Sequence, residues 1–284
     1  MPITALVLLF ASAILHTTWN LLLKQAGEKY IATWWAVLIG SVVFLPFLFF
    51  TGLPARETWH LLLISVLVET AYYATLSNAY NDSDFSLIYP MARGATPALI
   101  AVWSVFFLGE KLTFGGLLGL VVIISGLLLI GGSALLKGKG QKPHLHGIIL
   151  SLFLALLISI ISTIDGAAGK LTPAFSYAVL VFFLSPVLTA PLMFKRYGWH
   201  TLKNELFADS KRVIAIGLLT VGAYLLALGA YTIAPISYSG AIREVSVVMG
   251  AFAGWRFLGE RLGGWRLAGA VIIFAGIILI ALWG

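Results

Sequence analysis

The sequence predicts an all-α integral membrane protein with ten transmembrane helices, arranged as two inverted five-helix repeats. Of its 284 residues, 60% are hydrophobic and only 10% are charged, whereas a soluble domain carries about 25% charged residues. Apolar runs recur along the whole chain at about 20 residues each, which is the length that a helix needs to cross the hydrocarbon of a bilayer. Two stretches separated by 150 residues also resemble each other, which indicates an internal duplication.

The duplicated stretches are residues 242–262, IREVSVVMGAFAGWRFLGERL, and residues 92–112, ARGATPALIAVWSVFFLGEKL. An offset of 150 places Arg243 on Arg93, and it places the FLGE of 257–260 on the FLGE of 107–110. The same offset relates two glycine pairs further along the chain, Gly119 with Gly269 and Gly126 with Gly276. We therefore interpret the chain as two copies of one unit.

Glycine, proline and charge clusters divide each unit into five spans. In the first unit the spans are placed at residues 3–24, 31–51, 59–80, 85–108 and 114–135, and in the second at residues 147–168, 175–195, 212–233, 237–257 and 264–283. The hydrophilic linker at 136–147 separates the units, which we assign to residues 1–140 and 141–284. Because five is an odd number, the second unit must enter the membrane in the opposite direction. Such inverted repeats are typical of secondary transporters, whose substrate site lies near the midplane between the halves.

Composition and absent motifs exclude several other classes. The chain has no cysteine, so disulfides, thiolate metal sites and thiol nucleophiles are excluded, and we expect neither a cofactor nor a metal. Neither G-x-S-x-G nor H-E-x-x-H occurs, so an intramembrane enzyme is disfavoured, as is a sensor. The net charge of +7 is better explained by the basic loops of a membrane protein than by nucleic acid. Without a G-x-x-x-x-G-K-[ST] loop for ATP, energy must come from a gradient or from exchange.

The basic residues also bear on orientation. Thirteen of the eighteen Lys and Arg lie in or near loops that follow odd-numbered spans, and three follow even-numbered spans. By the positive-inside rule, both termini would then lie outside the cell. The first apolar run contains His16, Asn20 and Lys24 and lacks a basic leader and a small-residue cleavage site. We interpret it as a retained helix rather than a signal peptide.

Polar and charged side chains within the spans mark the candidate site, because charges are costly in hydrocarbon and usually face a polar interior. An Arg fork can hold a carboxylate with two hydrogen bonds, and aromatic faces can bind cations. We predict that the substrate contacts a set of charged, polar and aromatic side chains: Arg243, Glu244, Arg93, Trp19, Asn20, Tyr73, Tyr89, Tyr224 and Tyr238. Three further ionisable groups could carry a coupled proton: Glu69, Asp165 and His16. The alternative is that these charges only hold helices together, for example by pairing Arg243 with Glu69 or Asp165.

The duplication separates these groups into two kinds. Arg93 and Arg243 are symmetry mates, and because the halves are inverted they should meet near the midplane or flank it. Pro90, three residues before Arg93, can bend the helix beside this charge. Glu244 corresponds to Gly94, so the carboxylates are not duplicated. We hypothesise that the cation pair belongs to the shared transport mechanism, while the acids determine the substrate or the coupling ion.

The chain resembles the EamA family of the drug/metabolite transporter superfamily. The resemblance rests on the two five-span halves, the repeated F-L-G-E-[KR]-L corner after the fourth and ninth spans, and the glycine-spaced fifth and tenth spans. We interpret the corner as structural. The motifs HTTWN at 16–20 and AIREVS at 241–246 are similar to one branch of EamA-like bacterial transporters. The resemblance implies an inner-membrane location, a central cavity and alternating access, and it also implies cytoplasmic termini, which conflicts with the charge count.

The predicted function is a secondary transporter of small polar metabolites that works by alternating access. The favoured substrates are amino acids or related zwitterions, moved by export, with proton coupling and exchange both open. The alternative substrate is an organic cation such as a choline-like amine, held by Glu69 and an aromatic cage. The expected partners are a small-molecule substrate and the lipid bilayer, and the protein would be a monomer or a homodimer. The sequence does not give the substrate, the direction of transport or the coupling ion.

Overall fold

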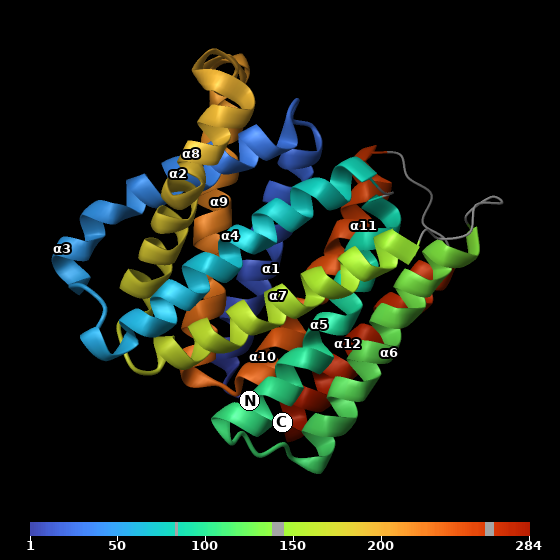
Figure 1. The fold of residues 1–284 in the computed structure, drawn as a ribbon. Helices are drawn as coiled ribbons and strands as arrows, with labels where there is room; N and C mark the ends of the chain where they lie inside the picture. The colour runs from blue at the N-terminus through green and yellow to red at the C-terminus, as the bar shows by residue number, and fades with distance from the viewer. Residues whose placement is uncertain (83–84, 138–144, 259–263) are drawn as a thin grey trace.

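The computed structural model describes residues 1–82, 85–137, 145–258 and 264–284, without the side chains at 76–82, 85–92, 94, 131, 133–137, 145–148, 251, 253–258 and 266. Throughout these ranges the chain forms helices joined by short connections, with no strand (Figure 1). The helices are α1 (Ile3–Lys24), α2 (Lys29–Phe44), α3 (Leu48–Thr51), α4 (Trp59–Asp82), α5 (Phe85–Leu108), α6 (Phe114–Lys137), α7 (Leu145–Gly169), α8 (Ala174–Ala208), α9 (Ser210–Ile233), α10 (Ile236–Arg243), α11 (Val245–Leu258) and α12 (Gly264–Trp283). Two 3-10 turns, Leu45–Phe47 and Arg56–Thr58, flank α3.

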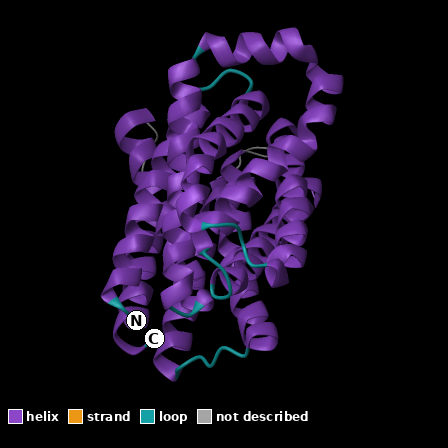
Figure 2. Cartoon of the chain, turned by 90° about the vertical axis from the view of Figure 1, so that its left-hand side faces the viewer, coloured by secondary structure: helices purple, strands orange, loops and turns teal. Residues whose placement is uncertain are grey.

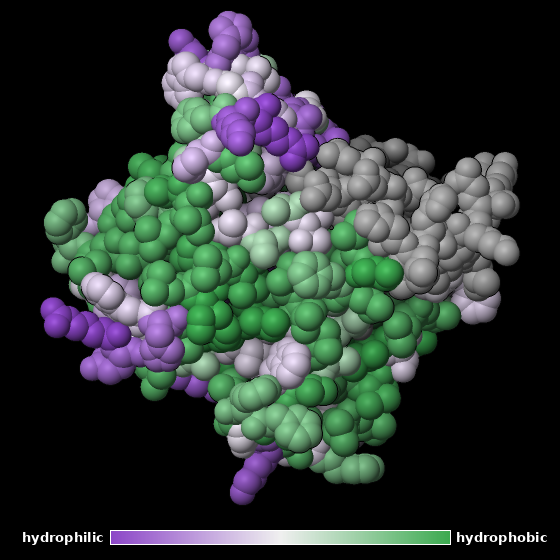
Figure 3. Space-filling model, viewed as in Figure 1, coloured by the Kyte–Doolittle hydropathy of each residue, from purple (hydrophilic) through white to green (hydrophobic). Residues whose placement is uncertain are grey.

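The part of the chain that the structure describes crosses the membrane ten times, with α2 and α3 forming one crossing and α10 and α11 another. Five helical segments in it are long and apolar enough to span a bilayer, and shorter apolar stretches lie in α5, α6 and α12. Figure 3 shows a broad hydrophobic area across the middle of the face that it draws, with hydrophilic residues at the top, the left edge and the bottom. Large apolar side chains such as Leu128, Val271 and Ile278 are exposed, as expected for a surface that faces lipid. The predicted fold class is confirmed.

Two glycine pairs at the crossing of α6 and α12 show the inversion directly. A Cβ atom on Gly126 would lie 2.8 Å from the carbonyl oxygen of Gly269, and one on Gly119 would lie 2.8 Å from that of Gly276. The offset of 150 residues converts one pair into the other, because it relates Gly119 to Gly269 and Gly126 to Gly276. The crossing is therefore self-complementary, as an approximate two-fold axis requires. The corresponding helices of the two repeats run in opposite directions.

Replacing Gly126 by leucine is expected to lower the free energy of unfolding by about 2 kcal/mol or more, because the new side chain would overlap the backbone of α12. The thermal unfolding midpoint in detergent measures the effect. Gly132→Leu is the matched control, since a Cβ atom at Gly132 of the same helix would meet nothing within 4 Å. If both substitutions lowered the midpoint equally, close approach at Gly126 would not be what stabilises the crossing.

The two repeats interlock and do not pack as separate bodies. α1 packs along α9, and the symmetry mate of α1, α7, packs along α4. α5 packs against α7 and α6 against α12, so that the main contacts join one repeat to the other. The predicted boundary between residues 140 and 141 lies outside the described residues. Any cavity between helices of different repeats is thus built by both halves.

α8 is longer than the predicted span at 175–195. It continues to Ala208 through a kink at Gly198, where φ is 72° and ψ is 153°. A residue with a Cβ rarely adopts such a positive φ, which explains the glycine. After the kink, the helical segment at 199–208 lies across the end of the bundle, at the top of Figure 2.

This segment and the α1–α2 loop form one end of the molecule, which we call the basic end. The backbone N–H of Glu28 donates to Oε1 of Glu205 at 2.7 Å and joins the two. Exposed basic side chains gather here: Lys24, Lys29, Arg196, Lys203 and Lys211. Both chain termini lie at the opposite end (Figure 1), where the amino group of Met1 donates to the carbonyl oxygen of Gly284 at 3.1 Å.

Candidate functional site

The predicted ninth span is broken where its two charged residues lie. α10 ends at Arg243 and α11 begins at Val245, so Glu244 lies in the break. The N–H of Glu244 donates to the carbonyl oxygen of Ala241 at 3.1 Å, a tightened turn typical of a helix end. Pro90 was expected to bend the corresponding helix of the first repeat, and α5 is uninterrupted over Phe85–Leu108. The helix is therefore interrupted in the second repeat, directly at Arg243 and Glu244.

Arg93 and Glu244 form an ion pair that joins the two repeats. Nη1 of Arg93 lies 2.9 Å from Oε1 of Glu244, and the side chains are 7% and 2% exposed. A charge-assisted hydrogen bond shielded from water in this way is stronger than one at the surface. Glu244 thus binds Arg93, which is the symmetry mate of Arg243, the residue directly before Glu244 in the chain.

His16 of α1 lies beside Arg93 and faces hydrogen-bond donors at both ring nitrogens. Its Nε2 contacts Nη2 of Arg93, and its Nδ1 lies 3.3 Å from Nε1 of Trp19. Guanidinium and indole N–H groups can only donate, whereas a neutral imidazole has a single acceptor nitrogen. His16 can therefore accept from only one of these two neighbours at a time.

Arg243 is half-buried, and its Cζ lies 5.6 Å from the centroid of the Tyr224 ring. Among the described residues, its buried Nε has no hydrogen-bond partner, and neither has the buried Oε2 of Glu244. Buried polar atoms without a partner are rare in native proteins and need an explanation such as a ligand or a functional role. One cationic donor and one anionic acceptor on consecutive residues thus lack partners in the part of the chain that the structure describes.

A second buried cluster surrounds Asp165 of α7. Its Oδ1 accepts a hydrogen bond from Ser65 of α4, and its Oδ2 accepts one from Tyr224 of α9. The hydroxyl of Tyr177, on α8, lies 3.0 Å from Oγ of Ser65. Because Tyr224 also lies beneath the guanidinium of Arg243, this hydroxyl cluster borders the helix break.

Glu69 lies one helical turn after Ser65 on α4 and is 7% exposed. Tyr73, one turn further on, interacts with the Glu69 carboxyl group. Arg243 acts electrostatically on four surrounding ionisable side chains: His16, Glu69, Asp165 and Glu244. Among the described side chains, no three His, Asp or Glu come together as metal ligands would. Arg243 is thus the common neighbour of the acids and of the predicted proton carriers.

Three predicted contact residues do not join these clusters. Nδ2 of Asn20 donates to the carbonyl oxygen of His16 at 2.7 Å, on its own helix. Tyr238 is fully buried but points toward the end with the termini, where its hydroxyl accepts from the N–H of Thr113 at 2.9 Å. Tyr238 lies in the first turn of α10, too far along the helix from Arg243 to share its surroundings. The side chain of Tyr89 lies outside the described residues.

Sequence reasoning missed two members of the Asp165 cluster, Ser65 and Tyr177. A signal existed for Ser65, because it lies four residues before Glu69 and therefore on the same face of the helix. No such signal existed for Tyr177, whose contact depends on how α8 packs against α4 and α7. Its position could be known only from the tertiary structure.

Glu110 of the repeated FLGE corner has a further role, since it caps the helix that carries Arg243. Its Oε1 accepts from the N–H of Ile236 at 2.6 Å, and its Oε2 accepts from the N–H and the hydroxyl of Ser237 at 3.1 and 2.7 Å. A carboxylate at a helix N-terminus satisfies N–H groups that have no partner within the helix and interacts favourably with the helix dipole. The corner of the first repeat thus positions α10 of the second.

Glu110→Ala is expected to lower the free energy of unfolding by about 1–2 kcal/mol, because three donors at the start of α10 lose their acceptor. The unfolding midpoint in detergent measures this loss. Glu57→Ala removes an exposed carboxylate at the same end of the molecule and should change the free energy by less than about 0.5 kcal/mol. A neutral result for Glu110→Ala would show that the cap does not hold α10 in place.

A helical membrane bundle built from two inverted repeats, with buried charges where the repeats meet, has the architecture of a secondary transporter. The model of the EamA-like transporter family matches residues 3–132 and again residues 145–282. The chain belongs to the EamA-like transporter family, and it is a transporter of the drug/metabolite transporter superfamily. The resemblance noted from the motifs is confirmed.

Solved structures support the same fold. One crystal structure is similar to this chain with a TM-score of 0.78 and 18% sequence identity, over 98% of this chain and 98% of the other. At that identity the likeness concerns the fold alone. None of the curated proteins matches the chain.

Proposed function

We propose that the protein exports amino acids or related zwitterions across the inner membrane by alternating access. The observation that carries this proposal is a pair of buried polar atoms at the helix break that have no hydrogen-bond partner among the described residues, Nε of Arg243 and Oε2 of Glu244. A zwitterion could satisfy both, with its carboxylate on Arg243 and its ammonium group on Glu244.

The count of buried charges supports coupling to a proton or to exchange. Among the described side chains, two guanidinium groups face three carboxyl groups in this region: Arg93 and Arg243 against Glu69, Asp165 and Glu244. An uncompensated charge is costly inside a membrane. The additional carboxyl group must therefore be protonated or face the ammonium group of a substrate. A proton or the ammonium group of a substrate could neutralise this carboxyl group, which is the basis for coupling the movement of the proton to that of the substrate.

The organic-cation alternative receives less support from the geometry. The face of Tyr224, a member of the predicted aromatic cage, is occupied by the guanidinium of Arg243. A cationic substrate without a carboxylate would also lie beside the guanidinium of Arg243 with no acceptor for its unpaired Nε.

The test is a ligand screen by thermal unfolding of the purified protein. Amino acids are compared with amines that lack the carboxylate and with organic acids that lack the ammonium group. We expect stabilisation by at least one amino acid and by neither class of partial analogue at equal concentration. Stabilisation by amines alone would overturn the zwitterion proposal in favour of the cation alternative.

Coupling is tested with any amino acid that binds, in proteoliposomes that carry an imposed pH gradient. We expect the gradient to drive accumulation of the amino acid, and collapse of the gradient to stop it. Accumulation that persists without a pH gradient and without substrate on the other side would contradict both proton coupling and exchange.

A further inference from the structure

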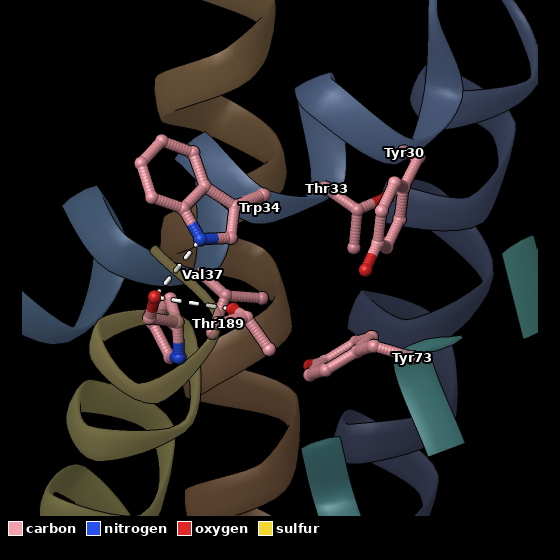
Figure 4. A pocket seen from close by; sticks show the side chains of 7 residues that line it. Tyr30, Thr33, Trp34, Val37, Tyr73 and Thr189 are labelled. Atoms are coloured by element: carbon pink, nitrogen blue, oxygen red, sulfur yellow. Dashed lines mark hydrogen bonds between the residues drawn. The ribbon is translucent and has the colours of Figure 1, made fainter. Parts of the chain in front are cut away.

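A hollow between α2, α4 and α8 lies apart from the helices that carry Arg93 and Glu244. About 270 Å³ of atom-free space, open solvent included, lies in and around it, and we call it the α2–α4–α8 hollow. It is lined by Tyr30, Thr33, Trp34, Val37, Tyr73, Pro186 and Thr189 (Figure 4). Its interior is narrow, so it suits single water molecules better than an organic solute.

The hollow reaches into the membrane from the basic end. Tyr30 is the second residue of α2, at the basic end itself, and Thr33 follows one turn later. Tyr73 lies nine residues before the end of α4 at Asp82, about 13 Å along the helix at 1.5 Å per residue. Thr189 lies at a comparable depth on α8, eight residues before Tyr197. The lining therefore extends from the polar end to a depth at which hydrocarbon surrounds the bundle.

Four of the seven lining residues carry a hydroxyl group, Tyr30, Thr33, Tyr73 and Thr189, although most of the accessible lining is apolar. Figure 4 shows the Tyr30 hydroxyl pointing toward Tyr73, whose ring projects toward the side chains of the other two helices. Thr189 donates to the carbonyl oxygens of α8, and Trp34 donates to the carbonyl oxygen of Pro186 at 3.0 Å, so these two groups are satisfied. The Tyr30 hydroxyl lies near the basic end, whereas the Tyr73 hydroxyl lies deeper and interacts with Glu69. A water molecule in the hollow would connect these two hydroxyls.

Tyr73 connects the hollow with the buried acid Glu69. The two residues lie four apart on α4 and interact through their side chains. From the other helices, Glu69 is faced by three groups: Asp165 of α7, Tyr224 of α9 and Arg243 of α10. Glu69 therefore lies between the hollow on one side and the Asp165 and Arg243 region on the other, with the Tyr73 hydroxyl as the group nearest the hollow.

We propose that the α2–α4–α8 hollow is a water entry from the basic end to the Glu69 carboxyl group, with the Tyr73 hydroxyl as the relay between them. A proton enters by hopping from water to the Tyr73 oxygen while the hydroxyl proton of Tyr73 passes to the Glu69 carboxylate, so that tyrosine is regenerated and glutamate becomes neutral. The hollow is lined by helices other than those that carry Arg93, His16 and Glu244, and Tyr73 is the predicted substrate contact that it shares with the site. Only its use in coupling rests on the proposed function.

The chain offers a direct test of the water entry, because it has no native cysteine. Single variants Thr33→Cys and Thr189→Cys are exposed to silver ions in membranes, and the remaining free thiol is then labelled after denaturation. Leu188→Cys is the matched control, since this neighbour on α8 is 50% exposed on the apolar surface. We expect silver to react at least tenfold faster at Thr33→Cys and Thr189→Cys than at Leu188→Cys. Equal, slow reaction at all three positions would overturn the water entry.

The relay is tested without any substrate, by infrared spectroscopy of the carboxyl groups after a pH jump. The Glu69 band is identified as the signal lost in Glu69→Gln. We expect Tyr73→Phe to slow its protonation at least tenfold, and Tyr72→Phe, which removes a hydroxyl one residue away and outside the lining, to leave the rate unchanged. Equal rates in the wild type and Tyr73→Phe would overturn the relay. Both tests stand even if no amino acid is transported, so their failure and failure of the proposed function are distinguishable.

Discussion

Glu244→Ala is expected to lower the free energy of unfolding by about 3–5 kcal/mol and to abolish transport. The substitution leaves the 6% exposed Arg93 without its carboxylate partner, and removing one member of a buried ion pair typically costs that much. At roughly 2–4 °C per kcal/mol for a protein of this size, the unfolding midpoint should fall by about 10 °C. Thermal unfolding in detergent and uptake in proteoliposomes measure the two effects.

A double-mutant cycle separates the ion pair from other effects of the substitution. Arg93→Ala/Glu244→Ala leaves neither charge buried alone, so we expect it to be more stable than the sum of the two single losses allows. Strict additivity would show that the two groups do not stabilise each other. Arg212→Ala is the control, because the Arg212–Asp209 pair has the same 2.9 Å separation but side chains 31% and 44% exposed. Its loss should cost less than about 1 kcal/mol.

Arg243→Ala is expected to leave the fold intact and to weaken amino-acid binding about 100-fold. Its Nε has no partner and its guanidinium lies against the Tyr224 ring, so little protein structure depends on it. A carboxylate held by this group would lose a buried charge pair, on the order of 3 kcal/mol, which corresponds to that factor. Titration of the ligand-induced shift in unfolding temperature measures the change in affinity.

Two further variants show which property of Arg243 matters. Arg243→Lys keeps the charge but loses the planar fork, so we expect an intermediate loss of about tenfold. Arg196→Ala is the matched control, since Arg196 also lies over a tyrosine, with its Cζ 5.2 Å from the Tyr197 ring, but at the basic end. Wild-type affinity in Arg243→Ala would contradict the proposed carboxylate site and leave the Arg93–Glu244 pair as a purely structural contact.

Several elements could be predicted because their signals are local in the chain. The length of each apolar run predicts a membrane helix, and the shared offset of Gly119, Gly126, Gly269 and Gly276 predicts the repeat. Five spans per unit then require inversion by counting alone. The close α6–α12 crossing was not predicted, although the spaced glycines that permit it were among the marks of the repeat. That the glycines of α6 and α12 face one another could be seen only from the positions of both helices in the tertiary structure.

The helix break at Glu244 had no comparable signal. In the first repeat, α5 contains Pro90 and is uninterrupted. In the second repeat, the chain between α10 and α11 is interrupted although residues 241–246 contain neither glycine nor proline. A helix distant in the sequence contacts the chain directly after the break, because the hydroxyl of Thr17 on α1 donates to the carbonyl oxygen of Ser246, in the first turn of α11, at 3.2 Å. A break stabilised by a distant segment cannot be inferred from the broken segment itself.

The sequence by itself determined that this protein spans the membrane, that it is a duplication with inverted halves, and which ionisable residues lie within its spans. These properties depend on hydrophobic length and on residue spacing along one chain. Only the tertiary structure decided how those residues are placed: Glu244 pairs with Arg93, Asp165 binds hydroxyl groups, Arg243 lies over the ring of Tyr224, and the hydroxyl of Tyr238 binds Thr113 at the end with the termini. The physical reason is that Arg93 and Glu244 are 151 positions apart in the chain. Their ion pair depends on how helices of different repeats cross and face one another, which cannot be inferred from the residues on either side of each in the sequence.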